Sequence, residues 1–223
     1  MSLDSFHEQR KALVGLLARS GVRDRAVLRA VGAVPRHRFV GEDQLDQAYA
    51  NSPLPIGEGQ TISQPLVVAL TAQALELLGE EVVLDVGTGS GYQAAILGWL
   101  CREVHSIERR ETLLTEARSR LHALGIDNVY CHRGDGTRGL PDHAPFDAIL
   151  VSAAGPSIPM PLVEQLAVGG RLVIPIGGPE GQVLRRVRKG VPGSSPIVED
   201  LIDVRYVPLV GEHGWPGPKD EKA

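Results

Sequence analysis

The strongest chemical signal in the sequence is a glycine-rich turn that joins an apolar run to an amphipathic run. Residues 83–91 read VLDVGTGSG, and the alternating glycines are Gly87, Gly89 and Gly91. Glycine lets the backbone adopt positive φ and approach a ligand closely, while the start of a helix offers free N–H groups and a positive dipole end. This pattern predicts a binding loop for a nucleotide-like ligand. A tight strand-to-helix connection without a ligand is the alternative.

The spacing of the glycines bears on which ligand the loop binds. The dinucleotide fingerprint G-x-G-x-x-G requires a third glycine where this chain has Tyr92. The G-x-G-x-G spacing found here suits S-adenosylmethionine, which has no pyrophosphate to cradle. We therefore expect S-adenosylmethionine, and a dinucleotide-dependent oxidoreductase remains an alternative.

Three acidic residues are expected beside this loop because each follows or ends an apolar run. Glu108 ends the next run, where a carboxylate accepts hydrogen bonds from ribose hydroxyls, and Asp135 lies in a Gly-Asp-Gly turn that suits the adenine end. The carboxyl ends of parallel strands form the ligand crevice of an open sheet, so these side chains converge there. Asp85 fits two roles equally well: contact with the ligand, or anchoring of the loop through backbone N–H groups.

The elements that position these residues alternate between strands and helices from Gly79 onward. Apolar periodicity predicts strands at 82–85, 104–107, 129–133, 148–151 and 171–176, and helices at 92–100, 111–124 and 161–166. Strands joined by helices form a parallel sheet that is covered on both faces. Two further runs, 182–188 and 202–207, have no helix between them and predict an antiparallel edge. The fold class is therefore α/β, with a doubly wound and mostly parallel sheet.

The part of the chain before this sheet is expected to be helical and rich in loops. Helices are predicted at 3–18 and 23–34, and prolines and glycines break the periodicity of 35–62. A third helix is predicted to start at Ser63, with a proline in its first turn, and to end at Gly79. Judged from the residues alone, Ser63 is an ordinary N-cap.

Length and composition narrow the class of protein. The 223 residues suit one domain with appendages, which we divide into an N-terminal extension (1–78), a ligand-binding core (79–210) and a tail (211–223). Twenty-three Lys and Arg against 27 Asp and Glu give a net charge of −4, which leaves no basic surplus for a nucleic-acid partner. No apolar run reaches the length of a membrane span, and the charged start of the chain is unlike a secretory signal. We expect neither nucleic acid nor membrane as a partner.

Cysteine and histidine usage predicts no metal centre. Cys101 and Cys131 fit neither a disulfide framework nor a zinc site, which favours a reducing cytoplasm as the location. The seven histidines show no ligand spacing, so we interpret them as surface or packing residues. Arg36 and Arg38 are expected in a solvated loop, and contact with the substrate backbone is the alternative.

Beyond the glycine loop, the sequence resembles the protein-L-isoaspartate O-methyltransferase family from its first helix to about Leu209. The matching stretches are AVPRHRFV (33–40), LPIGEGQTISQP (54–65), VLDVGTGSGYQAAIL (83–97), GDG (134–136), APFDAILVSAA (144–154), GGRLVIPIG (169–177) and RYVPLV (205–210). QTIS at 60–63, preceded by LPIG and followed by a helix, is the most diagnostic of them. The resemblance implies a Rossmann-like S-adenosylmethionine-dependent methyltransferase fold with an N-terminal helical extension and an antiparallel edge.

The resemblance also implies a reaction. Members of this family transfer a methyl group from S-adenosylmethionine to the α-carboxylate of L-isoaspartyl residues in damaged proteins and peptides, which initiates their repair. That carboxylate is already ionised at neutral pH, since the ordinary pKa of such a group is about 3.9, so neither a general base nor a metal is required. We expect a cytoplasmic monomer whose partners are isoaspartyl-containing proteins and peptides.

Site residues follow from the matching motifs. Ser63 matches the active-site serine of the family and is the expected catalytic residue, with a hydroxyl that orients the substrate carboxylate. The expected cofactor-binding residues are Gln60, Thr61, Ile62, Ser63, Asp85, Gly87, Gly89, Gly91, Glu108, Arg109, Asp135 and Gly136.

Three residues depart from those common in relatives. Glu58 and Leu66 border the active loop and bear on peptide preference, while Val210 bears on the carboxy-terminal part of the cofactor site. Two alternatives stay open beside general repair. One is a relative that methylates a dedicated aspartate in a modified peptide, and the other is a module that binds S-adenosylmethionine without turnover.

Overall fold

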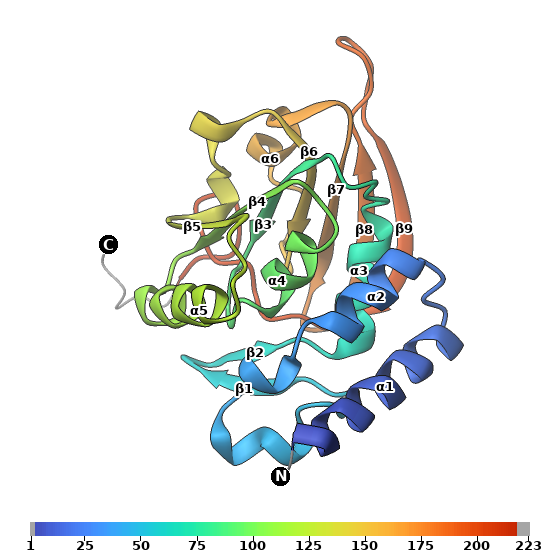
Figure 1. Ribbon diagram of the computed structural model, residues 1–223. Coiled ribbons are helices and arrows are strands. Elements are labelled where there is room, and N and C mark those ends of the chain that lie inside the picture. Colours follow the sequence, from blue (N-terminus) through green and yellow to red (C-terminus); the bar gives the residue numbers. More distant parts are fainter. Residues whose placement is uncertain (1–2, 218–223) are drawn as a thin grey trace.

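A seven-stranded sheet forms the centre of the computed structural model, which describes residues 3–217 (Figure 1). The strands run in the spatial order β5-β4-β3-β6-β7-β8-β9. Their bounds are β3 Val82–Val86, β4 Glu103–Glu108, β5 Val129–Arg133, β6 Phe146–Val151, β7 Leu166–Gly178, β8 Gly181–Arg188 and β9 Ile197–Val204. Strands β3 to β7 pair in parallel, whereas β8 and β9 pair antiparallel. The prediction of a mostly parallel sheet with an antiparallel edge is confirmed.

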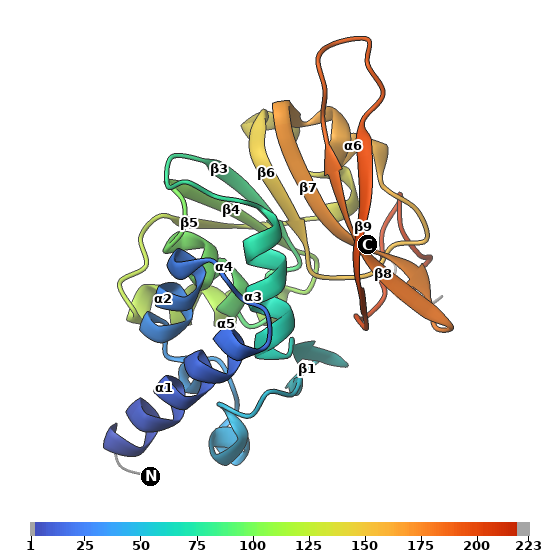
Figure 2. The same ribbon diagram turned by 90° about the vertical axis from the view of Figure 1, so that its right-hand side faces the viewer.

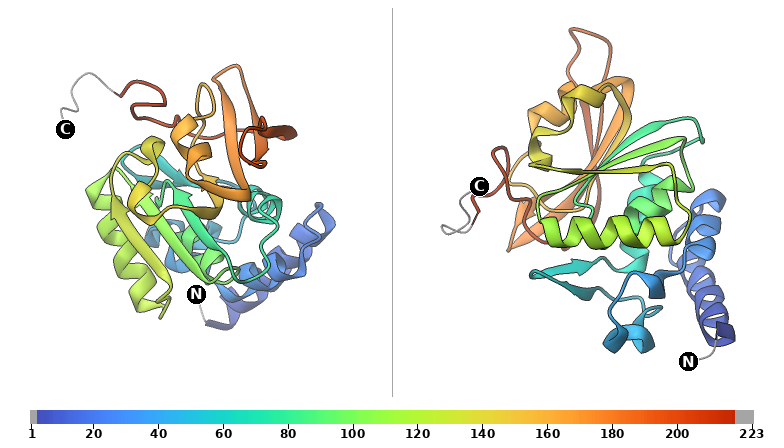
Figure 3. Two further views of the ribbon diagram at one scale, coloured as in Figure 1. Left: turned by 90° about the horizontal axis from the view of Figure 1, so that it is seen from above. Right: turned by 60° about the vertical axis from the view of Figure 1, so that its left-hand side comes forward.

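Helices cover both faces of this sheet, because its central strands are apolar on both sides. Helices α4 (Tyr92–Gly98) and α5 (Glu111–Ala123) lie on one face, and α6 (Met160–Glu164) packs on the other, next to the short 3-10 turns η3 (Gly136–Arg138) and η4 (Pro141–His143). Figure 3 shows α5 and these turns on opposite sides of the sheet. The sheet therefore has the doubly wound form that the sequence predicted.

The N-terminal helices share a hydrophobic core with the sheet domain. They are α1 (Leu3–Arg19), α2 (Arg25–Ala33) and α3 (Pro65–Ala74), and Figure 2 shows them gathered beside α4 and α5. The Asp24 side chain caps α2 by accepting hydrogen bonds from the amides of Ala26 and Val27. Leu17 and Val31 are buried in the same cluster as Ile96 of α4. The extension is thus held by apolar burial against the core, the dominant favourable term in folding.

The segment predicted as a loop contains regular structure. It forms two 3-10 helices, η1 (Arg36–Arg38) and η2 (Glu42–Gln47), and an antiparallel hairpin of β1 (Leu54–Gly57) and β2 (Gln60–Ile62). The hairpin turn has positive φ at Gly57, Glu58 and Gly59. Strands this short carry too few alternating residues for a periodicity signal, so they were not predicted from the sequence.

The start and end of α3 differ from their prediction. Its N-cap is Gln64 rather than Ser63, and Gln64 makes no capping bond through its side chain. Instead, the Asn51 side chain accepts a hydrogen bond of 3.0 Å from the amide of Leu66. The helix ends at Ala74, well before Gly79, because the following residues turn away toward β3. Strand β9 likewise lies earlier in the chain than the predicted strand 202–207. Among the helices of residues 3–217, none is long and apolar enough to cross a membrane.

Candidate active site

A cavity lies at the carboxyl ends of β3 and β4, next to the β1–β2 hairpin. Most of its lining comes from four segments: the QTIS residues 60–63, the glycine loop at 86–90, the end of β4 at 107–110, and the segment 207–210. The cavity and its open mouth together contain about 900 Å³ of space that no atom fills. This is the edge of a doubly wound sheet at which ligands bind.

Most of the predicted site residues line this cavity. They are Gln60, Thr61, Ile62, Ser63, Gly87, Gly89, Glu108, Arg109 and Gly136. Asp85, Gly91 and Asp135 were predicted with them but are not among its lining residues. Nine of the twelve predicted residues therefore line one cavity, and the other three lie outside its lining.

The glycine loop uses the conformational freedom of its residues. Gly87, Gly89 and Gly91 have φ of 96°, 52° and 91°, in the region that other residues rarely adopt. The amide of Gly87 donates to the carbonyl of Ile107 at 2.9 Å, which ties the loop to β4. A side chain at Gly91 would bring its Cβ within 3.3 Å of the Ala117 Cβ on α5. Gly91 thus allows the loop to pack closely on α5.

Glu108 joins the glycine loop to the end of β4. Its Oε2 accepts a hydrogen bond of 3.0 Å from the amide of Gly89, and its Oε1 accepts from the amides of Arg109 and Arg110 at 2.9 Å and 3.0 Å. The side chain is nearly buried but lines the cavity. Each carboxylate oxygen has more than one lone pair, so Glu108 retains capacity to accept hydrogen bonds from a ligand hydroxyl.

Asp85 lies below the loop in a chain of hydroxyl hydrogen bonds. Its Oδ2 accepts a hydrogen bond of 2.7 Å from the Ser106 hydroxyl. The Ser106 hydroxyl oxygen in turn lies 2.6 Å from the hydroxyl oxygen of Thr88 in the glycine loop. Burial raises the pKa of Asp85 to about 7, with a smaller contribution from the charge of Glu108, while the Ser106 hydrogen bond opposes the shift. Asp85 therefore holds the loop through side-chain hydroxyls, and not through the backbone N–H groups considered from the sequence.

Asp135 holds the carboxy-terminal segment beside the cavity. One of its oxygens accepts from the amide and hydroxyl of Thr137 at 2.9 Å and 2.7 Å, and the other accepts from the amide of Glu212 at 2.8 Å. Burial alone would raise the Asp135 pKa, but these hydrogen bonds outweigh it and lower the pKa. The Trp215 indole then donates to the carbonyl of Ala154 at 2.9 Å. These contacts fix Val210, which lines the cavity.

A second cavity adjoins the first through a shared wall. Thr61, Ser63, Ser152 and Val207 line both cavities. The rest of the second cavity is formed by Pro53, Gln64, Val67 and the segment 203–206. The Ser63 hydroxyl makes no hydrogen bond with any residue in the described range 3–217, so it is available to a bound molecule.

Arg36 supports the QTIS segment from the protein interior. It is fully buried, so the prediction that it lies in a solvated loop is wrong. Its Nη2 donates to the carbonyl of Ser63 at 2.9 Å, and its Nε donates to the carbonyl of Ala48 at 3.0 Å. The guanidinium carbon lies 4.9 Å from the centre of the Tyr92 ring. No spacing signal marks Arg36, because its partners come from distant parts of the chain.

Glu58 at the tip of the hairpin contacts the loop after β4. Its Oε2 lies 3.0 Å from Nη1 of Arg110, and both side chains are partly exposed. Exposed ion pairs contribute little to stability, so the pair orients the hairpin tip rather than stabilising the fold. Glu58, one of the three residues that differ from those common in relatives, is thus paired with Arg110 in this protein.

The Rossmann-like sheet, the glycine loop and the carboxylate at the end of the next strand define an S-adenosylmethionine-dependent methyltransferase. A family model described as protein-L-isoaspartate(D-aspartate) O-methyltransferase matches residues 8–214. The chain belongs to this family. It is accordingly an S-adenosylmethionine-dependent carboxyl methyltransferase that acts on L-isoaspartyl residues.

Individual relatives agree with this assignment. A protein-L-isoaspartate O-methyltransferase of Roseiflexus sp. (strain RS-1) is 54% identical over 210 residues, which is 94% of this chain and 95% of that protein. One of Myxococcus xanthus (strain DK1622) is 52% identical over 198 residues, 88% of this chain and 93% of that protein. The oxidoreductase and the binding module without turnover are therefore excluded.

Solved structures show the same fold. One protein-L-isoaspartate O-methyltransferase has a TM-score of 0.83 at 28% identity and covers 92% of this chain and 67% of that chain. A Plasmodium falciparum protein of the same description, in complex with S-adenosyl-L-homocysteine, has a TM-score of 0.79 at 28% identity and covers 90% of this chain and 98% of that chain.

Proposed function

We propose that the first cavity binds S-adenosylmethionine, that the second binds the isoaspartyl peptide, and that methyl transfer takes place at the wall between them. The observation that carries this proposal is the set of residues common to both cavities, which includes Thr61 and Ser63. A group-transfer enzyme needs its two substrates in contact at one point, and shared lining residues provide that point.

Within the first cavity, we assign the cofactor contacts to the residues that line it. Glu108 accepts hydrogen bonds from ribose hydroxyls, and the loop of Gly87 and Gly89 provides a surface for close approach of the cofactor. Gln60, Thr61, Ile62, Ser63, Arg109 and Gly136 complete this wall. Asp85, Gly91 and Asp135 act through other residues, by positioning the loop and the carboxy-terminal segment.

The chemistry demands positioning more than activation. S-adenosylmethionine supplies the methyl group on a sulfonium, and the attacking carboxylate is ionised at neutral pH. The protein must align the carboxylate oxygen with the methyl carbon and remove water from it. We assign the first task to Ser63, whose hydroxyl donates a hydrogen bond to one carboxylate oxygen and leaves the other free to attack. Arg36 holds the Ser63 backbone in place.

The second cavity has two charged lining residues, Asp203 and Arg205, and Arg205 is the one that can bind an anionic group on a peptide. Arg205 lies in its wall between Val204 and Tyr206 and is exposed. A guanidinium recognises a carboxylate through paired hydrogen bonds. We propose that Arg205 attracts the isoaspartyl carboxylate into the cavity, and that Ser63 then orients it.

We propose that each of the three segments predicted from the sequence has its own role. The extension at 1–78 supplies the active loop, and the core at 79–210 supplies the cofactor site. In the tail, Glu212 fixes the wall of that site through its hydrogen bond to Asp135. We further propose that the protein is a cytoplasmic monomer without a nucleic-acid partner. The net charge of −4 supports the last point, since it leaves no basic surplus for nucleic acid. Light scattering on the purified chain tests the monomer.

The deciding experiment measures transfer of labelled methyl from S-adenosylmethionine to two synthetic peptides. The peptides are identical except that one contains L-isoaspartyl and the other normal aspartyl at the same position. We expect a base-labile methyl ester on the isoaspartyl peptide alone. Labelling of neither peptide, with cofactor binding confirmed by calorimetry, would favour the relative that modifies one dedicated aspartate.

A further inference from the structure

Three histidines gather on the sheet face opposite α4 and α5, away from both cavities of the proposed site. They are His105 on β4, His132 on β5 and His143 at the end of η4. One ring nitrogen from each lies within 4.8 Å of those of the other two. Because these histidines show no ligand spacing in the sequence, surface or packing roles were expected for them.

Strand pairing explains how the first two meet. In the parallel register of β4 and β5, His105 pairs with Tyr130, and Ile107 pairs with His132. Side chains at alternate positions of a strand share one face, so His105 and His132 are diagonal neighbours on the same face. The turn η4 crosses this face and adds His143, whose ring centroid lies 4.2 Å from that of His105 and 4.9 Å from that of His132.

The buried ring of His105 is fixed by a carboxylate. Its Nε2 lies 2.7 Å from Oε1 of Glu103, and its Nδ1 lies 2.9 Å from Nε2 of His132. The Glu103 contact assigns the proton of His105 to Nε2, which leaves the Nδ1 lone pair directed into the cluster. A carboxylate that orients a histidine in this way is the usual outer-shell partner of a metal-binding imidazole.

The tautomer of His132 decides which of its ring nitrogens can bind a metal ion. The His132 proton that faces His105 can move to Nδ1 of the same ring, which frees Nε2 as a ligand and leaves that ring neutral.

We propose that His105, His132 and His143 bind one divalent transition-metal ion, with Zn²⁺ the best fit, and that Glu103 orients His105 toward it. A tetrahedral Zn²⁺ with Zn–N of about 2.0–2.1 Å places ligand nitrogens about 3.4 Å apart. The facing nitrogens of His105 and His132 lie 2.9 Å apart, so the ion would have to spread this pair by about 0.5 Å. All the ligand nitrogens lie within 4.8 Å of one another, and rotation of the exposed His143 ring brings its nitrogen closer. Water takes the fourth position.

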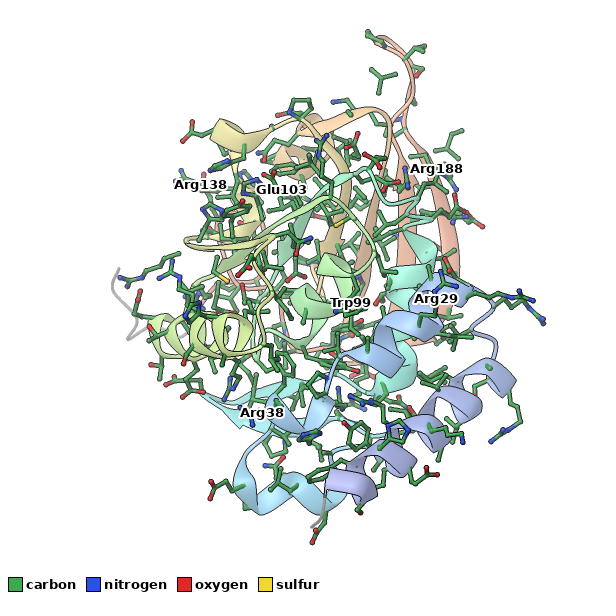
Figure 4. The ribbon with its side chains drawn as sticks, in the orientation of Figure 1. Arg29, Arg38, Trp99, Glu103, Arg138 and Arg188 are labelled. Carbon is green, nitrogen blue, oxygen red and sulfur yellow. The ribbon has the colours of Figure 1, made fainter. Side chains whose placement is uncertain are left out.

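This site takes no part in methyl transfer. No residue of the cluster lines either cavity, and three strand positions, about 10 Å, separate His105 from Glu108. Figure 4 shows Glu103 at the end of the sheet away from the β1–β2 hairpin. The bound ion instead ties the turn η4 to the edge strand β5.

Calorimetric titration of ZnCl₂ into the full-length, metal-free protein tests the proposal. We expect one ion per chain, and His143→Ala weakens Zn²⁺ binding by more than about 100-fold because it removes a ligand. Glu103→Gln weakens binding by about 10- to 100-fold, as changes to outer-shell partners do. His122→Ala, at an exposed histidine of α5, is the matched control and leaves affinity unchanged. Absence of binding by the parent overturns the proposal, as does binding that survives His143→Ala.

The absorption spectrum of the Co²⁺-loaded protein gives a second readout that does not depend on activity. We expect the intense visible bands of tetrahedral cobalt in the parent and in His122→Ala, and their loss in His143→Ala. Unchanged S-adenosylmethionine affinity shows that each variant is folded. A weak octahedral spectrum that is the same in all three proteins overturns the site, whatever the outcome of the methyl-transfer assay.

Discussion

Arg36 donates a hydrogen bond of 2.9 Å from Nη2 to the carbonyl oxygen of Ser63, from a position with no exposure to solvent. Burial lowers the pKa of this guanidinium, and its contact with Tyr92 opposes the shift. The charge is retained because carbonyl oxygens and an aromatic face surround it. The backbone of Ser63 is thus fixed from inside the protein, and Ser63 lines both cavities.

Arg36→Lys tests this support. Lysine keeps the charge but cannot reach the carbonyls of Ala48 and Ser63 with the same planar geometry. We expect the free energy of unfolding in urea to fall by about 1–3 kcal/mol, as for buried acceptors left unpaired. We also expect a lower kcat for the isoaspartyl peptide. Arg38→Lys, at the exposed arginine labelled in Figure 4, is the control; equal losses in both variants would contradict the role of Arg36.

Ser63→Ala separates substrate orientation from cofactor binding. The variant removes a hydroxyl that makes no hydrogen bond within residues 3–217, so we expect stability and S-adenosylmethionine affinity close to those of the parent. Turnover of the isoaspartyl peptide is expected to fall, because the carboxylate loses the donor that orients it. Steady-state kinetics and calorimetry measure the two effects. Kinetics equal to those of the parent would rule out this function of Ser63.

Glu108→Ala is expected to weaken S-adenosylmethionine binding by about 1–3 kcal/mol, through loss of hydrogen bonds to a charged acceptor. The amide of Gly89 also loses its partner, so the loop loosens. Calorimetry measures the change in affinity. Glu103→Gln on the same strand, far from the cavity, provides the control, and an affinity unchanged in Glu108→Ala would refute the assignment.

Asp85→Asn is expected to change how stability depends on pH. The folded state favours protonated Asp85, so its contribution to the free energy of unfolding is complete below the ordinary aspartate pKa of 3.8 and is lost as pH rises through about 7. Asparagine is neutral at every pH and avoids this loss. We expect the variant to gain on the order of a few kcal/mol relative to the parent between about pH 5 and pH 8. Parallel urea-unfolding profiles of the two proteins would show that Asp85 does not titrate in this range.

The sheet and the glycine loop could be predicted because their signals are local. Apolar runs of strand length alternate with helical faces after Gly79, and the three glycines fall where a strand becomes a helix. The convergence of Glu108 with this loop followed from the rule that parallel strands end at one edge.

Other parts of the site could not be predicted, since they depend on contacts between distant residues. Arg36 is buried only because η1 packs under the QTIS segment, and Asp135 contacts Glu212 from the far end of the chain. The histidine cluster requires the register of β4 and β5 together with the path of η4. None of these relationships leaves a spacing pattern in the sequence.

The path of the carboxy-terminal segment has a consequence for biosynthesis. Residues 207–210 line the first cavity, and the backbone and indole of Trp215 hold that wall through Leu209 and Ala154. These residues follow all seven strands of the sheet in the chain, so they leave the ribosome after the strands do. A nascent chain therefore has every strand of its sheet before it has this wall of the cavity.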